Sequence, residues 1–193
     1  MSFTENERGL IIHVKEGIQK YVESKFEELA PIVGASHLET WIRDTFVVSG
    51  GISASMFTRT KVKDIDLYYH SSATVEAINN TFQDNFLNEN APWRHFIKDV
   101  NPAYMVGEVN GKMVTANAIT LINDMQLIRL GGVDDCRKIF DFKHCLPVYD
   151  LKNKVYKISR NEFDSLTTKK LMTHHGVPKD HRVVKFKSRG WDF

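Results

Sequence analysis

The chain has 193 residues, enough for one domain, and its 42% hydrophobic and 26% charged content is ordinary for a globular protein. No apolar run reaches about 18 residues, so we expect no transmembrane helix and no membrane partner. Residues 1–17 lack the apolar core of a signal peptide. The two cysteines, Cys136 and Cys145, lie outside any Cys-x-x-Cys spacing, which is typical of a reduced, cytoplasmic protein.

The net charge of +2 conceals an asymmetry along the chain. Residues 1–150 contain 15 Lys and Arg against 20 Asp and Glu, whereas residues 151–193 contain 11 against 4. An acidic body followed by a basic C-terminal segment suits a polyanionic partner. A solvated charged surface explains the same pattern equally well.

The first half of the chain alternates between helical and extended patterns. Apolar residues recur at a helical period across residues 6–30. Ser36 lies three residues before Glu39, a capping-box spacing that predicts the start of a second helix. The β-branched run 45–50 predicts a buried strand that ends in glycine. Beyond it we expect a short helix at 52–59, a strand at 64–69 and a helix at 72–90 capped by Ser72.

Strand-like runs dominate the second half. Residues 104–130 predict a β-ribbon with turn signals at Asn110-Gly111 and Asn123-Asp124. The remaining expectations are a helix at 132–140, a strand pair within 140–159 that turns near Lys152-Asn153, a helix at 160–175, and a basic strand or extended tail at 181–193.

Helices followed by strands mixed with helices predict an α+β or α/β fold. We expect a mixed β-sheet flanked by helices, with an N-terminal helix and extra β-hairpins. No repeat or linker divides the sequence, which predicts a single domain over residues 1–193. Its parts would be N-terminal helices in 1–45, a core in 46–150 and a basic C-terminal segment in 151–193.

Two carboxylates one residue apart form the first candidate site. Asp64 and Asp66 are i and i+2 on the expected strand, so their side chains share one face while Ile65 and Leu67 point into the core. Neighbouring carboxylates repel each other, and a divalent cation neutralises them. Oxygen ligands of this kind suit Mg²⁺ or Mn²⁺, which complete their shells with water and substrate phosphates.

The glycine bend before that strand fits the same chemistry. Gly50 and Gly51 let the backbone turn sharply into a helix and approach a ligand closely. The amides there can bind a phosphate. Hydroxyl donors are expected from Ser49 and Ser53, and positive charge from Arg59, Lys61 and Lys63.

The stretch "GGISASMFTRTKVKDIDLYY" resembles the signature of the DNA polymerase β-type nucleotidyltransferase superfamily. It is particularly similar to the Gly-Gly and Lys-Asp-Ile-Asp element of CCA-adding enzymes and poly(A) polymerases. It departs from them at Ile52-Ser53-Ala54, where those enzymes usually carry Val-Arg-Asp. Weaker similarity across residues 46–191 extends to small nucleotidyltransferase-like proteins of phages and large DNA viruses. The resemblance implies a nucleotidyltransferase-like fold, with residues 46–150 as its catalytic core, and a phage-encoded protein in the host cytoplasm.

The resemblance also implies a third carboxylate on a neighbouring strand. Asp141, between Phe140 and Phe142, is the first candidate, and Asp150 and Glu108 are alternatives. An aspartate in a turn is the structural alternative for Asp141.

The predicted activity is metal-dependent transfer of an NMP from an NTP to a hydroxyl, with release of pyrophosphate. The acceptor would be an RNA 3′ end, such as that of a tRNA, or a protein side chain. Lys185, Lys187 and Arg189 would contact the triphosphate or the nucleic acid. Two alternatives stay open: an inactive nucleotide- or nucleic-acid-binding module of the same fold, and an antitoxin-like protein nucleotidyltransferase.

Overall fold

The computed structural model describes residues 2–70, 74–109 and 112–193, with 75, 100–109 and 112–117 described by their backbone alone. The helices are α1 (Glu5–Leu29), α2 (Ala35–Thr45), α3 (Gly51–Thr58), α4 (Val75–Phe82), α5 (Val133–Lys138), α6 (Arg160–Thr168) and α7 (Asp180–Lys187). Short π- and 3₁₀-helical turns are η1 (Gln83–Leu87), η2 (Arg94–Phe96) and η3 (Lys143–Cys145). The strands are β1 (Phe46–Ser49), β2 (Ile65–Tyr69), β3 (Ile97–Val109), β4 (Lys112–Leu121), β5 (Met125–Gly132), β6 (Val148–Asp150) and β7 (Val155–Lys157).

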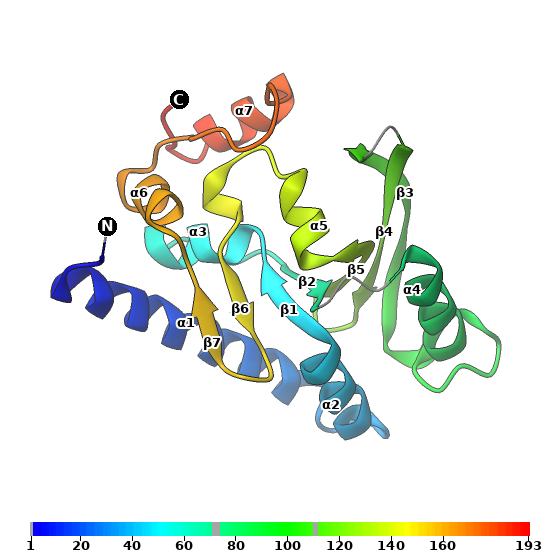
Figure 1. The fold of residues 1–193 in the computed structure, drawn as a ribbon. Helices are drawn as coiled ribbons and strands as arrows, with labels where there is room; N and C mark the ends of the chain where they lie inside the picture. Colours follow the sequence, from blue (N-terminus) through cyan, green and yellow to red (C-terminus); the bar gives the residue numbers. More distant parts are fainter. Residues whose placement is uncertain (1, 71–73, 110–111) are drawn as a thin grey trace.

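One mixed sheet runs through the molecule in the order β3-β4-β5-β2-β1-β6-β7 (Figure 1). The β2–β5 pair is parallel, and the other neighbouring pairs are antiparallel. The chain between β2 and β5 contains α4 and the β3–β4 ribbon, the kind of long crossover that a parallel pair requires. The predicted α+β class, with a mixed sheet flanked by helices, is confirmed.

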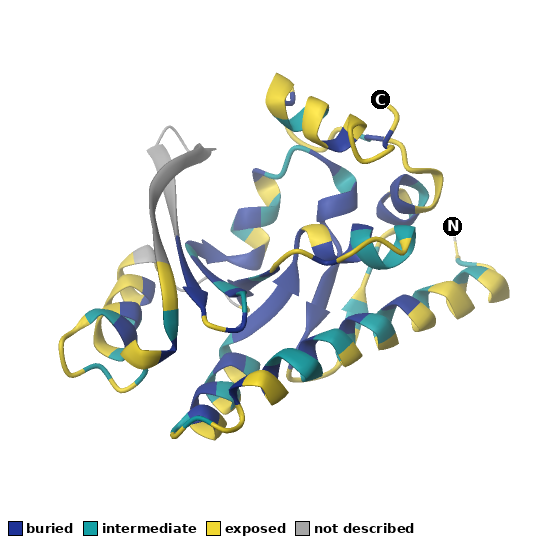
Figure 2. Cartoon of the chain, turned by 180° about the vertical axis from the view of Figure 1, so that it is seen from behind, coloured by how far each residue is buried: buried dark blue, intermediate teal, exposed yellow. Residues whose placement is uncertain are grey.

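The two faces of the sheet bury different helices. Residues of β1 and β2 alternate in direction, so Val48 and Leu67 pack on the α1 side and Val47 and Tyr68 on the α5 side. Figure 1 shows α1 and α5 on opposite faces, and Figure 2 shows the sheet buried between them. This alternation decides which face receives every other residue of β2, including Asp66.

The long helix α1 forms because a cap and an apolar stripe agree. The Thr4 hydroxyl accepts from the Glu7 amide while the Glu7 carboxylate accepts from the Thr4 amide, which satisfies two free donors at the helix start. The buried side of the helix consists of Val14, Ile18, Val22, Phe26 and Leu29. At Gly17, an added Cβ would lie 3.2 Å from Met56 Sδ, so glycine lets α1 lie close to α3.

Most predicted elements lie where the sequence placed them, including the turns at Asn123-Asp124 and near Lys152-Asn153. The turn signal Asn110-Gly111 lies outside the described residues. The two predicted helix caps are wrong. Gly34, with φ +87°, precedes α2 and puts Ser36 inside its first turn. Thr74 caps α4 by accepting from the Ala77 amide, and Ser72 lies outside the described residues.

The C-terminal segment differs most from expectation. Helix α6 ends at Thr168 because the backbone that follows forms hydrogen bonds with other segments. The Leu171 amide donates to the Asp192 carbonyl at 2.6 Å, and Thr173 forms a β-bridge with Phe142. The predicted basic strand or tail at 181–193 is wrong, because its first part is helix α7. Phe186 and Trp191 are buried there in a cluster that also contains Phe142 and residues of α3 and α6.

We predict that Trp191→Ala lowers the free energy of unfolding by about 3–5 kcal/mol, because it leaves a cavity where the indole packs 4.2 Å from the His144 ring. Trp191 is 4% exposed, whereas Phe193 two residues later is 65% exposed. Phe193→Ala is therefore the matched control and should change stability little. Urea unfolding measures both; equal effects would mean that the C-terminal segment is not anchored by Trp191.

Candidate active site

A carboxylate meets the glycine bend at the end of β1. The antiparallel register places Ser49 opposite Asp66. Gly50 follows Ser49 with φ +88°, a conformation that L side chains rarely adopt. A Cβ added at Gly50 would lie 2.9 Å from Asp66 Oδ2. The backbone and the carboxylate can approach this closely because position 50 has no side chain.

The second carboxylate lies one step outside the strand. Strand β2 begins at Ile65, so Asp64 occupies the loop just before it rather than the strand that the sequence predicted. Asp64 is exposed and Asp66 is partly buried. Ile65 and Leu67 point into the core on the α1 side, which leaves Asp66 on the α5 side together with Tyr68.

The environment of Asp66 opposes its ionisation. Burial is the main cause that raises the pKa of Asp66 to about 7, and the negative charge of Asp64 adds to it. The positive charges of Lys185 and Arg182 act in the opposite direction. The pKa of Tyr68 is raised well above its ordinary value, mainly by burial and then by the charge of Asp66.

The donor set fits a hard divalent cation. Within the described part of the chain, no salt bridge joins Asp64 or Asp66 to a basic side chain within 4.0 Å. Mg²⁺ is commonly held by one or two carboxylates and completes its shell with substrate phosphates. Among the described residues, no three His, Cys, Asp or Glu side chains form a group that could hold a metal. The two aspartates could therefore contribute at most two protein ligands to a metal ion among these residues.

The predicted phosphate-binding residues at the bend divide into buried and open ones. The Ser49 hydroxyl is buried and donates toward the carbonyls of Cys145 (3.2 Å) and Pro147 (3.0 Å). Ser53 is buried and accepts from the Tyr156 hydroxyl at 3.0 Å. The Gly50 amide donates to the Cys145 carbonyl at 3.0 Å. Gly51 is exposed at the start of α3, and an added Cβ there would meet open space.

The candidates for a third carboxylate lie elsewhere. Asp141 is in a bend after α5 rather than on a strand, and its Oδ2 lies 2.6 Å from Arg182 Nε. Asp150 lies opposite Val47, at the far end of β1 from the glycine bend, and its carboxylate contacts His70 and Asn153. The side chain of Glu108 lies outside the described residues.

Helix α7 brings positive charge toward the aspartates. The charges of Lys185 and Arg182 influence Asp66, and that of Asp64 influences Lys185. Burial lowers the pKa of Lys185, and the nearby Arg189 and Arg182 lower it further. Lys187 is exposed two positions beyond Lys185, which places it on another side of the helix. Lys63 is exposed next to Asp64 in the loop before β2.

Arg182 is the residue that sequence reasoning missed. Its spacing of three residues from Lys185 is the helical signal that could have revealed it, because those two positions share one side of α7. Gln126, which lies in register with Asp66 on β5, was also missed. Only the strand pairing identifies it, and no local pattern marks it.

The thiol and imidazole near the bend are buried rather than poised for catalysis. Burial raises the pKa of the Cys145 thiol to about 12, so the thiolate is scarce at neutral pH. His144 is fully buried among the rings of Phe142, Phe186 and Trp191. Burial, reinforced by the charges of Arg182 and Arg189, lowers the pKa of His144 to about 3, so the ring is neutral.

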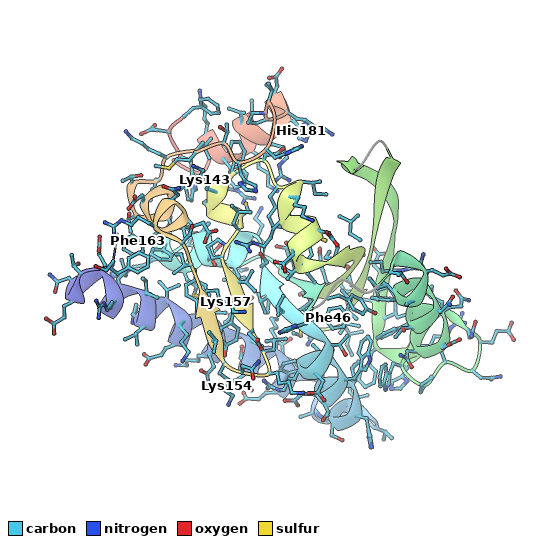
Figure 3. All side chains as sticks on the ribbon, viewed as in Figure 1. Phe46, Lys143, Lys154, Lys157, Phe163 and His181 are labelled. Atoms are coloured by element: carbon cyan, nitrogen blue, oxygen red, sulfur yellow. The ribbon has the colours of Figure 1, made fainter. Side chains whose placement is uncertain are left out.

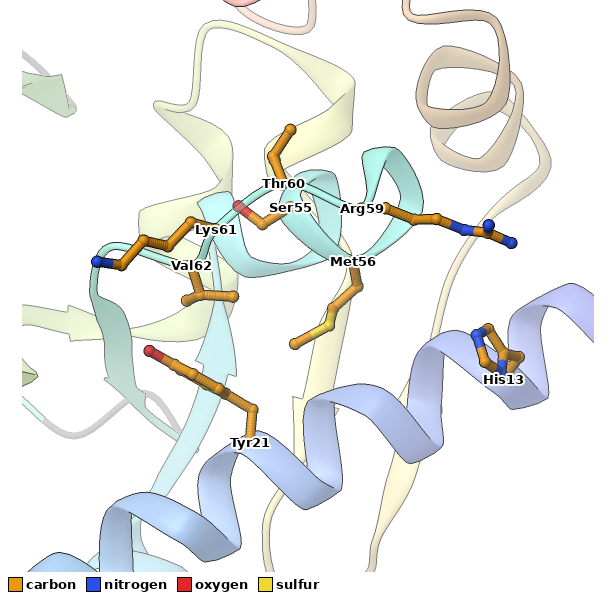
Figure 4. A pocket seen from close by; sticks show the side chains of 8 residues that line it. All are labelled: His13, Tyr21, Ser55, Met56, Arg59, Thr60, Lys61 and Val62. Atoms are coloured by element: carbon orange, nitrogen blue, oxygen red, sulfur yellow. The ribbon is translucent and has the colours of Figure 1, made fainter.

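A separate pocket of about 450 Å³ lies between α1 and the C-terminal end of α3 (Figure 4). Tyr21, Met56 and Val62 form its apolar part, while His13 and Arg59 lie toward one end. It is on the α1 side of the sheet, opposite the face that carries Asp66. The pocket and the acidic site are therefore distinct features.

Comparison with solved structures finds CCA-adding enzymes. The Thermotoga maritima CCA-adding enzyme complexed with tRNA is 12% identical, with a TM-score of 0.40, and the match covers 67% of this chain and 28% of that one. Two apo forms of a CCA-adding enzyme are 13% and 12% identical, with TM-scores of 0.40 and 0.41. They match 75% and 78% of this chain and 35% and 37% of their own. The chain thus spans only about a third of the length of these enzymes, and similarity this low does not say what it does.

The fold and the site together define an α+β protein with an acidic pair at a glycine bend, faced by a cationic helix. No curated protein matches the chain. The model of the Gabija anti-defense 2 family matches residues 15–169. The chain belongs to this family.

We predict that Asp66→Asn stabilises the metal-free protein above pH 7. A carboxyl whose pKa is raised on folding binds its proton more tightly in the folded state, so ionisation destabilises the fold progressively between about pH 4 and pH 7. The variant lacks this penalty, and its advantage of roughly 1–3 kcal/mol should be full above pH 7 and fade as the pH falls to about 4. Thermal unfolding in a chelator across this pH range measures it.

Asp99→Asn is the control for that experiment, because Asp99 is an exposed aspartate on β3. The unfolding temperature of the Asp99→Asn variant should equal that of the unmodified chain at each pH. An Asp66→Asn advantage that does not change with pH would contradict the raised pKa.

We predict opposite outcomes for alanine at the two glycines. Gly50→Ala places a methyl group against Asp66 and forces a disfavoured φ, which should cost roughly 1–3 kcal/mol and displace the carboxylate. Gly51→Ala adds a methyl group in open space and should be nearly neutral. Unfolding temperature and Mn²⁺ binding measured on both variants test this; tolerance of alanine at position 50 would show that the close approach is not required.

Proposed function

We propose that this protein is a metal-dependent nucleotidyltransferase that transfers an NMP from an NTP to a hydroxyl group and releases pyrophosphate. The observation that supports this most directly is the contact between the Gly50 backbone and Asp66, with Asp64 beside it. Few structural needs explain a partly buried carboxylate next to another acidic side chain. A metal ion with a bound triphosphate explains both.

The roles follow from the placement of each residue. Asp64 and Asp66 would hold Mg²⁺ or Mn²⁺, which when bound neutralises charge on the phosphates. Phosphate oxygens would meet the amide of Gly51 and the next amides of α3, where a helix start favours anions, while the Gly50 amide donates to the Cys145 carbonyl and Gly50 contributes the close approach of its backbone. The other predicted phosphate-binding side chains are Ser49, Ser53, Lys63, Lys185, Lys187 and Arg189. The third-ligand role of Asp141 stays a prediction, because its carboxylate pairs with Arg182 here.

The reaction needs positioning more than covalent chemistry. The acceptor oxygen forms a bond to the α-phosphorus as the bond between that phosphorus and the oxygen bridging to the β-phosphate breaks. Pyrophosphate leaves, and the hydroxyl proton passes to water or to a free carboxylate oxygen of the acidic pair. Cations on α7 would stabilise the negative charge that builds up on the leaving pyrophosphate.

The acceptor would be an RNA 3′ end, such as that of a tRNA, or a protein side chain in the cytoplasm. The family description names action against a defence system called Gabija. A protein component of that system, or an RNA of the infected cell, is therefore the acceptor class to examine for a phage-encoded enzyme. Transfer to a protein would correspond to the antitoxin-like alternative.

One observation favours a second candidate function, an inactive nucleotide-binding module of the same fold. Within the described residues, Asp64 and Asp66 are not joined by a third acidic, histidine or cysteine ligand. A two-carboxylate site can bind a metal–nucleotide complex without placing it for attack. Nucleotide binding without any release of pyrophosphate would support this candidate.

We predict that Asp64→Asn combined with Asp66→Asn abolishes NTP-dependent labelling of any acceptor, with a loss of at least about 1,000-fold. The protein is incubated with each α-³²P-labelled NTP, Mg²⁺, and total host RNA or lysate. Gel separation then identifies the nucleotide used and the acceptor. The matched control is Asp135→Asn on α5, a partly exposed aspartate whose salt bridge among the described residues is with Lys138.

Labelling that persists in the double variant would discard the assignment. Labelling of RNA, of protein, or of neither separates the acceptor classes and the inactive module. Both asparagine variants keep the volume of the side chain, so a lost signal reports on charge rather than on packing.

A further inference from the structure

The side of helix α7 that carries Arg182 is fixed in place by packing. Phe186 is 5% exposed and Trp191 is 4% exposed, and both lie in the cluster that includes Phe142. The guanidinium of Arg182 lies 5.9 Å from the centre of the Phe186 ring. Figure 3 shows α7 with His181, the residue before Arg182, at the end that lies over α5. The helix therefore has a defined orientation over the face that carries Asp66.

Asp141 forms an ion pair with this guanidinium. Its Oδ2 lies 2.6 Å from Arg182 Nε. The backbone at Asp141 is itself held, because its carbonyl accepts from the His174 amide at 2.8 Å and the next residue bridges to Thr173. Within the described residues, Asp141 is the one carboxylate that forms a salt bridge with Arg182, and the buried Nε of Arg182 has no hydrogen bond of good geometry. The contact is therefore an ion pair that leaves the N–H groups of the guanidinium without hydrogen-bond acceptors among these residues.

A short segment connects this pair to the glycine bend. The turn η3 begins two residues after Asp141 and ends at Cys145, whose carbonyl accepts from the Gly50 amide at 3.0 Å. The same carbonyl accepts a hydrogen bond from the Ser49 hydroxyl at 3.2 Å. The charge of Arg182 also acts on Asp66, which agrees with a location beside the acidic pair.

We propose that Arg182 binds a phosphate group of the substrate nucleotide and that Asp141 is the residue that positions it. The inference rests on the proposed function, because it assigns the triphosphate contacts of the same site. An arginine fork matches two phosphate oxygens at once, which a lysine ammonium cannot do. Pairing with Asp141 at 2.6 Å restrains the guanidinium before the nucleotide arrives, which reduces the ordering required on binding.

This assignment gives Asp141 a different task from metal binding. A metal ligand contributes directly to cation affinity, whereas a positioning residue acts only through Arg182. The two roles predict different responses to the same substitution, so they can be separated by experiment.

The test measures equilibrium binding of Mn²⁺ alone, of tripolyphosphate and of ATP with Mg²⁺ to the full chain. Arg182→Gln should weaken ATP and tripolyphosphate binding by about 10- to 100-fold and should not weaken Mn²⁺ binding. Asp141→Asn should weaken ATP binding by about 3- to 10-fold, again with unchanged Mn²⁺ binding. In the Arg182→Gln background, Asp141→Asn should add nothing, because a residue that acts through another is non-additive with it.

Lys154→Gln is the control for loss of one positive charge, because Lys154 is exposed in the turn between β6 and β7, away from α7 (Figure 3). Arg182→Lys guards against a folding defect: it keeps the charge but not the fork, and should bind ATP with intermediate affinity. ATP binding equal to that of the unmodified chain in Arg182→Gln would overturn the inference while the proposed function stands. Loss of Mn²⁺ affinity in Asp141→Asn would make Asp141 a metal ligand and overturn its positioning role. An unmodified chain that binds none of the four NTPs in the presence of Mg²⁺ would remove the proposed function and this inference together.

Discussion

The close approach of the Gly50 backbone to the Asp66 carboxylate constrains the backbone conformation of the glycine bend and the environment of the carboxylate. The strand register between β1 and β2 brings the two positions together, and the left-handed conformation at Gly50 turns the chain away before it collides with the carboxylate. A side chain at position 50 would remove the space that the carboxylate occupies. The same contact shields Asp66 from water, which is the main reason that its pKa rises. Geometry and electrostatics at this point are therefore two results of one packing arrangement.

The alternation of side chains along β2 explains why the C-terminal helix matters to the site. Residues 65, 67 and 69 are committed to the core beneath α1, so Asp66 must face the opposite side. That side is covered by the short helix α5 and leaves room for α7. The cluster around Phe186 and Trp191 fixes α7 there, at the end of β1 where the glycine bend lies. A segment distant in sequence thus adds Arg182 and Lys185 to the local Lys63 beside the acidic pair.

The sequence predicted the parts of the fold that depend on local patterns. The period of α1, the alternation in β4 and β5, and the glycine bend followed by Asp66 are all local signals, and each corresponds to an observed feature. The start of α2 was misplaced because a left-handed Gly34 leads directly into the helix, and side-chain caps are the only start signal that a sequence displays.

Features that depend on distant partners were not predictable in the same way. Basic residues dominate the sequence of 181–193. The few apolar residues there indicate a buried helix only once their packing against Phe142 and α6 is known. The pairing of Asp141 with Arg182 joins two segments whose contact is created by the fold. The sequence analysis expected Asp141 on a strand, whereas it lies in a bend and pairs with Arg182.

Charge compensation links the acidic pair, the cationic helix and the order in which ligands can enter. Asp64 and Asp66 face Lys185 and Arg182, so opposite charges are close to balance before any ligand is present. A triphosphate alone would bring its negative charge toward the two aspartates, and a metal ion alone would be repelled by the cations of α7. Each ligand reduces the repulsion that the other meets, so in the proposed function their binding is mutually favourable. Under the proposed function, the arrangement would favour a metal–nucleotide complex over either component, because two carboxylates and a cationic helix would each compensate one part of that complex.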